Sequence, residues 1–257
     1  MEQNGRRTGC RSITMDGVLL RRTRAEVEVI VEVMRTESTE MYLVTVYRLT
    51  RTVPYTATSD IAATLRVSLP SVSEKVKRLA EQGYMEHQWR RGVALTEAGL
   101  QIALNVIRKH RLIATFLVQQ VGYLLEDVYE EACRLEHAAS DYFVDRLEEM
   151  LGYPRIDPQG HPIPARDGTV ALSSYEPLTS ISPGQTVVIR CVNTLDQARL
   201  RYIRELGLLP HTRIQVLDIA PFEGPLMVHI GERTVALARM IANDIEVDCE
   251  GEKVAHE

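Results

Sequence analysis

The chain has 257 residues, of which 45% are hydrophobic and 25% charged, as in an ordinary globular protein with two or three domains. No apolar run approaches the ~20 residues of a membrane span and no signal peptide is recognisable, so we expect neither a membrane protein nor an exported one. The four cysteines lie far apart and form no CxxC pair, which argues against a disulfide framework and favours a cytoplasmic protein.

The net charge of −5 is spread unevenly along the chain. Residues 41–110 hold 10 Lys and Arg against 5 Asp and Glu, whereas residues 111–257 hold 13 basic and 23 acidic residues. A basic module joined to an acidic remainder indicates that only the first module meets a polyanion.

Residues 1–37 form an arginine-rich extension without a clear hydrophobic period before Val27–Val33, and we expect it to be poorly ordered. The first convincing helix begins near Glu40. Ser38 can cap this helix, and Glu37 and Glu40 lie at the end of the helix dipole that favours negative charge.

Residues 38–97 are predicted to form a winged helix-turn-helix domain. A short helix over 58–67, capped by Ser59, is followed by a tight turn and by a second helix over 70–82 that opens with Pro70. Residues 84–88 and 93–95 alternate around a basic tip, as in a hairpin. The alternative is a three-helix core with an incidental hairpin, but the positive charge and the basic tip favour DNA binding.

The candidate DNA contacts lie at helix starts and at the hairpin tip. Small polar residues at the opening of the second helix would face base edges or flanking phosphates, whereas Lys75 and Arg91 would supply sequence-independent phosphate attraction. The full candidate set is Ser38, Ser59, Ser68, Pro70, Ser71, Ser73, Lys75 and Arg91.

Residues 98–152 are predicted to form a helical dimerisation domain. Thr96 caps a long helix that stops at Gly122, a second helix runs from about residue 125 to 137, and Ser140 caps a third over 141–151. Their apolar stripes are too wide to face water, so we expect a homodimer.

The second of these helices carries a candidate metal site. Cys133, Glu136 and His137 stand at i, i+3 and i+4, so a thiol, a carboxylate and an imidazole share one helix face. A divalent transition metal accepts all three donors together. The alternative is a partly buried helix with a core cysteine and a solvated Glu-His pair.

The C-terminal part begins with a Pro- and Gly-rich linker over residues 153–177. Short β-type segments over 185–192, 213–219, 226–230 and 233–237, with one helix over 196–206, predict a small SH3-like β-barrel within residues 178–248, and residues 249–257 form a tail. The fold class is therefore mainly α with small β.

With these pieces in order, the chain resembles the diphtheria toxin repressor family of iron- and manganese-dependent regulators. Over residues 38–164 the resemblance rests on four ordered segments, and the run Arg204–Pro210 resembles the FeoA-type domain often appended in that family. The segments are Thr39–Leu43, Arg108–Leu112, Glu131–His137 and Asp157–Pro164.

The resemblance implies a primary metal site made of Met41, Cys133, Glu136 and His137. Sulfur ligands at the first two positions resemble the iron-responsive branch, so Fe²⁺ is preferred over Mn²⁺, and other divalent first-row metals can substitute. His110 matches a ligand of the family's ancillary site. The other ancillary ligands are not matched, because Ala114, Tyr129, Cys191 and Thr194 stand at their places. His110 is thus either a residual ligand or a histidine held by its neighbours.

The resulting hypothesis is a repressor of metal-uptake genes that binds a palindromic operator in double-stranded DNA when metal links the two domains. A manganese-responsive regulator, or a winged-helix regulator that senses redox or a small ligand, is the alternative. A metal hydrolase would need a substrate cleft and a general base, which no second cluster supplies, so we expect no enzyme and no small-molecule substrate.

Overall fold

The computed structural model describes residues 37–88, 90–171 and 174–249. The predicted disorder of the N-terminal extension and most of the C-terminal tail lie outside these residues. In the described part of the chain no helix is long and apolar enough to cross a membrane. Cys133 and Cys191 are free thiols.

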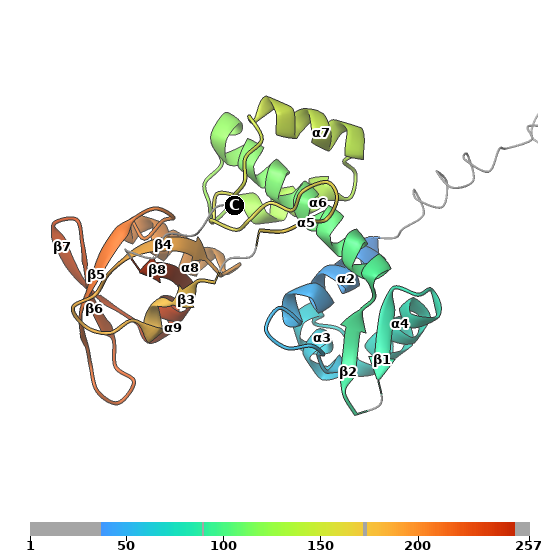
Figure 1. The fold of residues 1–257 in the computed structure, drawn as a ribbon, viewed down its shortest axis with the longest axis horizontal. Coiled ribbons are helices and arrows are strands. Elements are labelled where there is room, and N and C mark those ends of the chain that lie inside the picture. Colours follow the sequence, from blue (N-terminus) through green and yellow to red (C-terminus); the bar gives the residue numbers. More distant parts are fainter. Residues whose placement is uncertain (1–36, 89, 172–173, 250–257) are drawn as a thin grey trace, which may run out of the picture. The chain divides into compact units, whose positions relative to one another are not determined.

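The N-terminal domain is a winged helix-turn-helix, as predicted (Figure 1). Its elements are α2 (Glu37–Leu49), α3 (Thr58–Leu65), α4 (Leu69–Glu81), β1 (Met85–Gln88) and β2 (Gly92–Leu95). Leu43, Ile61 and Leu79 are fully buried in its core, and each stabilises the fold by roughly 1.5–3 kcal/mol relative to an exposed side chain.

Two expected helix caps in this domain are wrong. The residue that precedes α3 is Ala57, so Ser59 lies inside the helix, where its hydroxyl donates to Asp60. Ser38 also lies inside α2, which already includes Glu37. By contrast, Ser68 caps α4 and accepts from the backbone N–H of Ser71. The start of α3 has no side-chain cap at all, so the hydroxyl of Ser59 was not a reliable sign of where that helix begins.

The helix α5 (Glu97–Phe116) belongs to two hydrophobic cores at once. Its first half, including Ile102 and Ile107, packs in the winged-helix core, and its second half, including Leu112 and Ile113, packs in the core of the helical domain. Thr96 caps it as predicted, and its last turn continues as the π-helix η1 (Leu117–Val121), which Gly122 ends in the left-handed conformation. The helical domain is completed by α6 (Val128–Glu136) and α7 (Asp141–Met150).

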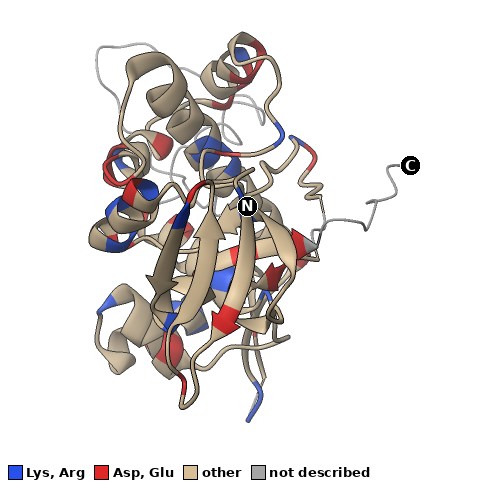
Figure 2. Cartoon of the chain, turned by 90° about the vertical axis from the view of Figure 1, so that its left-hand side faces the viewer, with Lys and Arg blue, Asp and Glu red and all other residues tan. Residues whose placement is uncertain are grey.

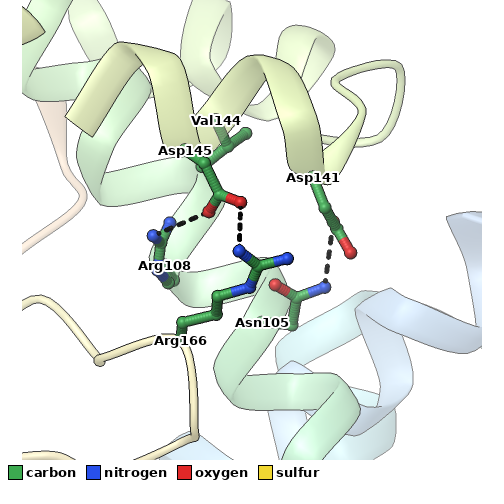
Figure 3. A pocket seen from close by; sticks show the side chains of 6 residues that line it. All are labelled: Asn105, Arg108, Asp141, Val144, Asp145 and Arg166. Carbon is green, nitrogen blue, oxygen red and sulfur yellow. Dashed lines mark hydrogen bonds and ion pairs between the residues drawn. The ribbon is translucent and has the colours of Figure 1, made fainter. Parts of the chain in front are cut away.

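The connector that follows α7 is fastened back onto the helical domain. Arg108 of α5 is buried, and its guanidinium donates to Asp145 of α7, which also pairs with Arg166 of the connector at 2.7 Å (Figure 3). These groups, with Asn105 and Asp141, line a cavity of about 140 Å³. Charge pairing, rather than apolar packing, therefore holds the connector at this point.

The C-terminal domain is an open antiparallel sheet with strand order β3-β8-β4-β5-β6-β7, so the expected closed barrel is wrong. Its strands are β3 (Glu176–Pro177), β4 (Thr186–Val192), β5 (Arg213–Ile219), β6 (Leu226–Ile230), β7 (Arg233–Leu237) and β8 (Ile245–Cys249). The helices are η2 (Leu178–Ser180), α8 (Gln197–Leu206) and α9 (Arg239–Asn243). Residues of both charges are scattered over the strands of the sheet (Figure 2).

Polar contacts from two segments, the residues before α6 and the connector, join this sheet domain to the rest of the chain. Glu126, which precedes α6, is 1% exposed and accepts two-pronged hydrogen bonds from Arg204 of α8. In the connector, Gln159 donates to the carbonyls of Val192 and Thr194. Leu125 adds its side chain to the core of the sheet domain.

Replacement of Gly160 by alanine is expected to weaken the attachment of the connector. Gly160 has a φ of +90°, and a Cβ there would overlap the carbonyl oxygen of Arg190. Gly184 is a matched control, because its φ of +89° is the same while a Cβ meets nothing within 4 Å. Gly160→Ala should therefore cost about 1–3 kcal/mol more than Gly184→Ala in the free energy of unfolding measured with urea. Equal costs would show that the close approach to Arg190 does not matter.

Candidate metal centre and DNA-reading surface

The candidate metal centre is built around the carboxylate of Glu136. Glu136 ends α6 and is only 9% exposed. One of its oxygens lies 2.7 Å from Nδ1 of His110 on α5, and the other lies 3.4 Å from Nε2 of His137, the next residue. A buried carboxylate between two imidazoles is thus the centre of the cluster.

Cys133 lies one turn earlier on the same face of α6. Its Sγ is 3.8 Å from Nδ1 of His110, and the donor atoms of His110, Cys133 and Glu136 all lie within 4.8 Å of one another. Thiol, imidazole and carboxylate together suit a divalent transition metal. Cys133 and Glu136 of the predicted face thus lie together with His110, whereas His137 follows the end of α6 and is not a member of this group of three.

The environment of Cys133 keeps its thiol protonated. Burial, followed by the charges of Glu136 and Glu130, raises the pKa of Cys133 to about 11, although Tyr129 and Arg48 lower it. A metal would therefore have to displace a proton from this sulfur.

The second ring nitrogen of His137, Nδ1, contacts a residue of the N-terminal domain. Nδ1 of His137 lies 2.6 Å from the Glu40 carboxylate of α2. Met41, which the family resemblance implies as a ligand, is the next residue on α2 and is 45% exposed. The α2 side chain that reaches His137 is that of Glu40, so the role of Met41 stays a prediction.

The residues at the family's ancillary positions have other partners. Tyr129 of α6 accepts a hydrogen bond from Arg48 of α2, and its ring lies 5.1 Å from that of His110. Cys191 is buried and its thiol donates to the carbonyl of Gly160, while Thr194 accepts from the backbone of Asp196. Among the described residues, the His, Cys, Asp and Glu ligands form one candidate group of three, that of His110.

Glu40 and Tyr129 are the site residues whose contacts the sequence reasoning missed. Local sequence features predict only a helix-dipole effect for Glu40, and the family resemblance implies only an unmatched ligand position at Tyr129. Their partners lie 97 and 81 residues away in the chain, so no local spacing could have revealed the contacts. The available signal was the presence of Glu40 in one of the segments that carry the family resemblance.

The predicted DNA-reading residues of α4 mostly face outward. Ser68, Pro70, Ser71 and Ser73 are exposed at its start, and Arg91 is exposed at the hairpin tip; Ser38 and Ser59 are exposed as well. Lys75 differs, because its ammonium donates to Thr39 at 3.0 Å and lies over the ring of Tyr42. Lys75 thus joins α4 to α2 in addition to any phosphate contact.

Comparison with known proteins agrees with this arrangement. The N-terminal DNA binding domain of the iron dependent repressors matches residues 34–93, their metal binding and dimerisation domain matches residues 96–165, and the FeoA domain matches residues 176–249. The iron-dependent repressor IdeR of Mycobacterium tuberculosis is 34% identical over 227 residues, which cover 82% of this chain and 97% of the relative. The diphtheria toxin repressor of Corynebacterium glutamicum is 38% identical over 223 residues, 82% of this chain and 96% of the relative.

A solved structure has the same fold. The manganese-dependent transcriptional repressor in complex with manganese has a TM-score of 0.76 and 33% sequence identity, and the match covers 82% of this chain and 99% of that one. The resemblance inferred from the sequence is therefore confirmed. The chain belongs to the family of metal-dependent transcriptional repressors that includes IdeR and the diphtheria toxin repressor, which are DNA-binding proteins and not enzymes.

Proposed function

We propose that this chain represses metal-uptake genes and binds its operator when a divalent metal occupies the cluster around Glu136. The observation that carries the proposal is the convergence of thiol, carboxylate and imidazole groups from α5 and α6 at a point where His137 also contacts α2. A bound divalent ion would supply the positive charge that a Cys133 thiolate and the Glu136 carboxylate share.

Met41, Cys133, Glu136 and His137 are the proposed primary ligands, and His110 lies beside them as a fifth donor. Met41 is the α2 member of this set, so its thioether would tie the DNA-reading domain to α6. The other four come from α5 and from α6 with its following residue. A set divided in this way makes metal affinity depend on how α2 lies against the helical domain.

The link between metal and DNA follows from this division. A ligand shifts an equilibrium between two arrangements only by its differential affinity for them. α2 and α4 share one hydrophobic core, so residues that hold α2 against α6 also favour one placement of α4, the proposed DNA-reading helix. A coupling of about 1–3 kcal/mol would change operator affinity about 5–150-fold.

We propose Fe²⁺ as the natural metal, with Mn²⁺ as the alternative. The soft sulfur donors of Met41 and Cys133 favour iron over manganese. The sequence identity to a relative named for iron is similar to the identity to a structural neighbour named for manganese. The preference for iron therefore rests on the two sulfur donors.

We further propose that the protein acts in the cytoplasm as a homodimer on a palindromic operator. Tyr142, Phe143 and Met150 of α7 are more than half exposed, an arrangement that suits an apolar interface between two copies. Two reading helices related by a twofold axis match a palindrome in double-stranded DNA.

A sensor of redox or of a small ligand is the competing function. Redox sensors use exposed thiols of low pKa. Cys133 is largely buried and its pKa is raised, so a redox-sensing role is disfavoured. A small-ligand sensor has a candidate binding place in a cavity of about 260 Å³ beside His110, lined by Arg48, Arg111 and Tyr129. This cavity is smaller than typical ligand pockets. Native mass spectrometry without stoichiometric metal would favour this competing function.

The central test is operator binding measured by fluorescence anisotropy under anaerobic conditions. Fe²⁺ should raise the affinity about 5–150-fold in the wild type, and Cys133→Ala should remove most of this gain because the thiolate ligand is lost. Affinity without metal should be similar for both proteins. Equal wild-type affinities with and without Fe²⁺ and Mn²⁺ would end the corepressor proposal.

Arg91→Ala is expected to weaken DNA binding without changing sequence preference. Arg91 is exposed at the hairpin tip, where its side chain reaches only Gln88 among the described residues, so it is available to a phosphate. Affinity should fall for operator and unrelated DNA alike, and the slope of log affinity against log salt should decrease by about 1. A loss confined to the operator would instead indicate a base contact.

Metal affinity is expected to fall with decreasing pH because the Cys133 thiol must ionise. With its pKa at about 11, this thiol is protonated near neutrality, so its ionisation alone makes the dissociation constant rise about tenfold for each unit that the pH falls. Anaerobic competition with a chromogenic chelator measures this slope. Cys133→Ala should bind the metal more weakly, and its dissociation constant should depend on pH with a slope that is smaller by one proton. Identical slopes for the two proteins would show that the thiolate is not a ligand.

A further inference from the structure

The contact between Glu40 and His137 is unusual because it joins a residue of the DNA-reading domain to a residue of the metal cluster. Oε2 of Glu40 lies 2.6 Å from Nδ1 of His137, and both side chains are mostly buried, with 20% and 16% exposed. The shielding from water strengthens a charge-assisted hydrogen bond at this distance. Glu40 therefore fixes the ring of His137 at one nitrogen.

The other nitrogen of the same ring faces the cluster. Nε2 of His137 lies 3.4 Å from Oε1 of Glu136, whose second oxygen reaches His110. A carboxylate can only accept, so the hydrogen bond to Glu40 requires the proton of a neutral ring to sit on Nδ1 and leaves the lone pair on Nε2. The tautomer that Glu40 selects is thus the one that can bind a metal from the side of Glu136.

We propose that Glu40 is a positioning residue that orients His137 for metal binding and carries the state of the metal site to α2. The inference rests on the proposed function, because it takes His137 as a ligand. Glu40 is not a ligand in this arrangement, since its carboxylate occupies the ring nitrogen that faces away from Glu136. Carboxylate–histidine pairs of this kind fix ring orientation and raise the basicity of the ligand nitrogen.

The pair also gives a route from metal to DNA that does not need Met41. A cation bound at Nε2 would make Nδ1 of His137 a stronger donor, so the hydrogen bond to Glu40 would tighten and would hold α2 more firmly against α6. By reciprocity, α2 held in place by DNA would raise the metal affinity by the same factor.

The test compares Glu40→Gln with Glu37→Gln, which makes the same change of charge at an exposed position one turn earlier on α2. The dissociation constant for Co²⁺ is measured by calorimetry, and its absorption spectrum reports the ligands. Glu40→Gln should weaken Co²⁺ binding about 10–100-fold at unchanged stoichiometry, with a spectrum that keeps its ligand set. Glu37→Gln should bind like the wild type.

A second readout needs no metal. Nitrogen-15 NMR of the metal-free protein should show the His137 ring protonated on Nδ1 in the wild type, and a mixture of tautomers in Glu40→Ala. Thermal unfolding followed by circular dichroism checks that each variant remains folded. A wild-type tautomer in folded Glu40→Ala would overturn the inference.

His137→Ala separates the inference from the proposed function. If His137→Ala weakens Co²⁺ binding while Glu40→Gln behaves like Glu37→Gln, Glu40 has no positioning role and the proposed function stands. If His137→Ala binds Co²⁺ like the wild type, the proposed ligand set itself is wrong. Altered stoichiometry or loss of a ligand band in Glu40→Gln would make Glu40 a ligand and overturn the positioning role.

Discussion

The structure depends on one helix that is a member of two cores. Ile102 and Ile107 of α5 are buried against the winged-helix domain, and Leu112 and Ile113, less than two turns further on, are buried against α6 and α7. A continuous helix is stiff over this length, so the two domains share a rigid element, and α2 and α6 meet beside it. The contacts that join α2 to α6 and to His137 therefore lie beside an element that both domains share.

Glu136 shows why this meeting point suits an ionic switch. A carboxylate with 9% exposure is costly unless charged or polar partners compensate for the lost water, and its partners are two histidines and a neighbouring thiol. All of these groups can give up a proton or bind a cation. The local cost of burying Glu136 therefore favours a positive charge at the cluster, which a divalent metal provides more completely than a single protonated imidazole does.

The sequence predicted what local chemistry decides. Apolar periodicity located the helices, and the hydroxyls of Thr96 and Ser140 marked two helix starts correctly, because a cap acts within its own turn. The i, i+3, i+4 spacing also predicted the shared face of Cys133 and Glu136. Closure of the β domain was wrong, because it depends on whether β3 and β7 pair across space, and the residues of either strand do not encode that. The partner of His137 was missed for the same reason.

One position where the family resemblance implies an ancillary ligand takes part in a contact between α2 and α6. Where the family resemblance implies a histidine, the phenol of Tyr129 on α6 accepts a hydrogen bond from Arg48 on α2. About two turns before Arg48 on α2, the carboxylate of Glu40 contacts His137. Polar contacts thus join α2 to α6 near both ends of α2 without any metal. Under the proposed function, a metal at the cluster would add to contacts that already join α2 to α6 and His137. A chain built in this way should respond to metal through small shifts in an existing contact rather than through the assembly of a new interface.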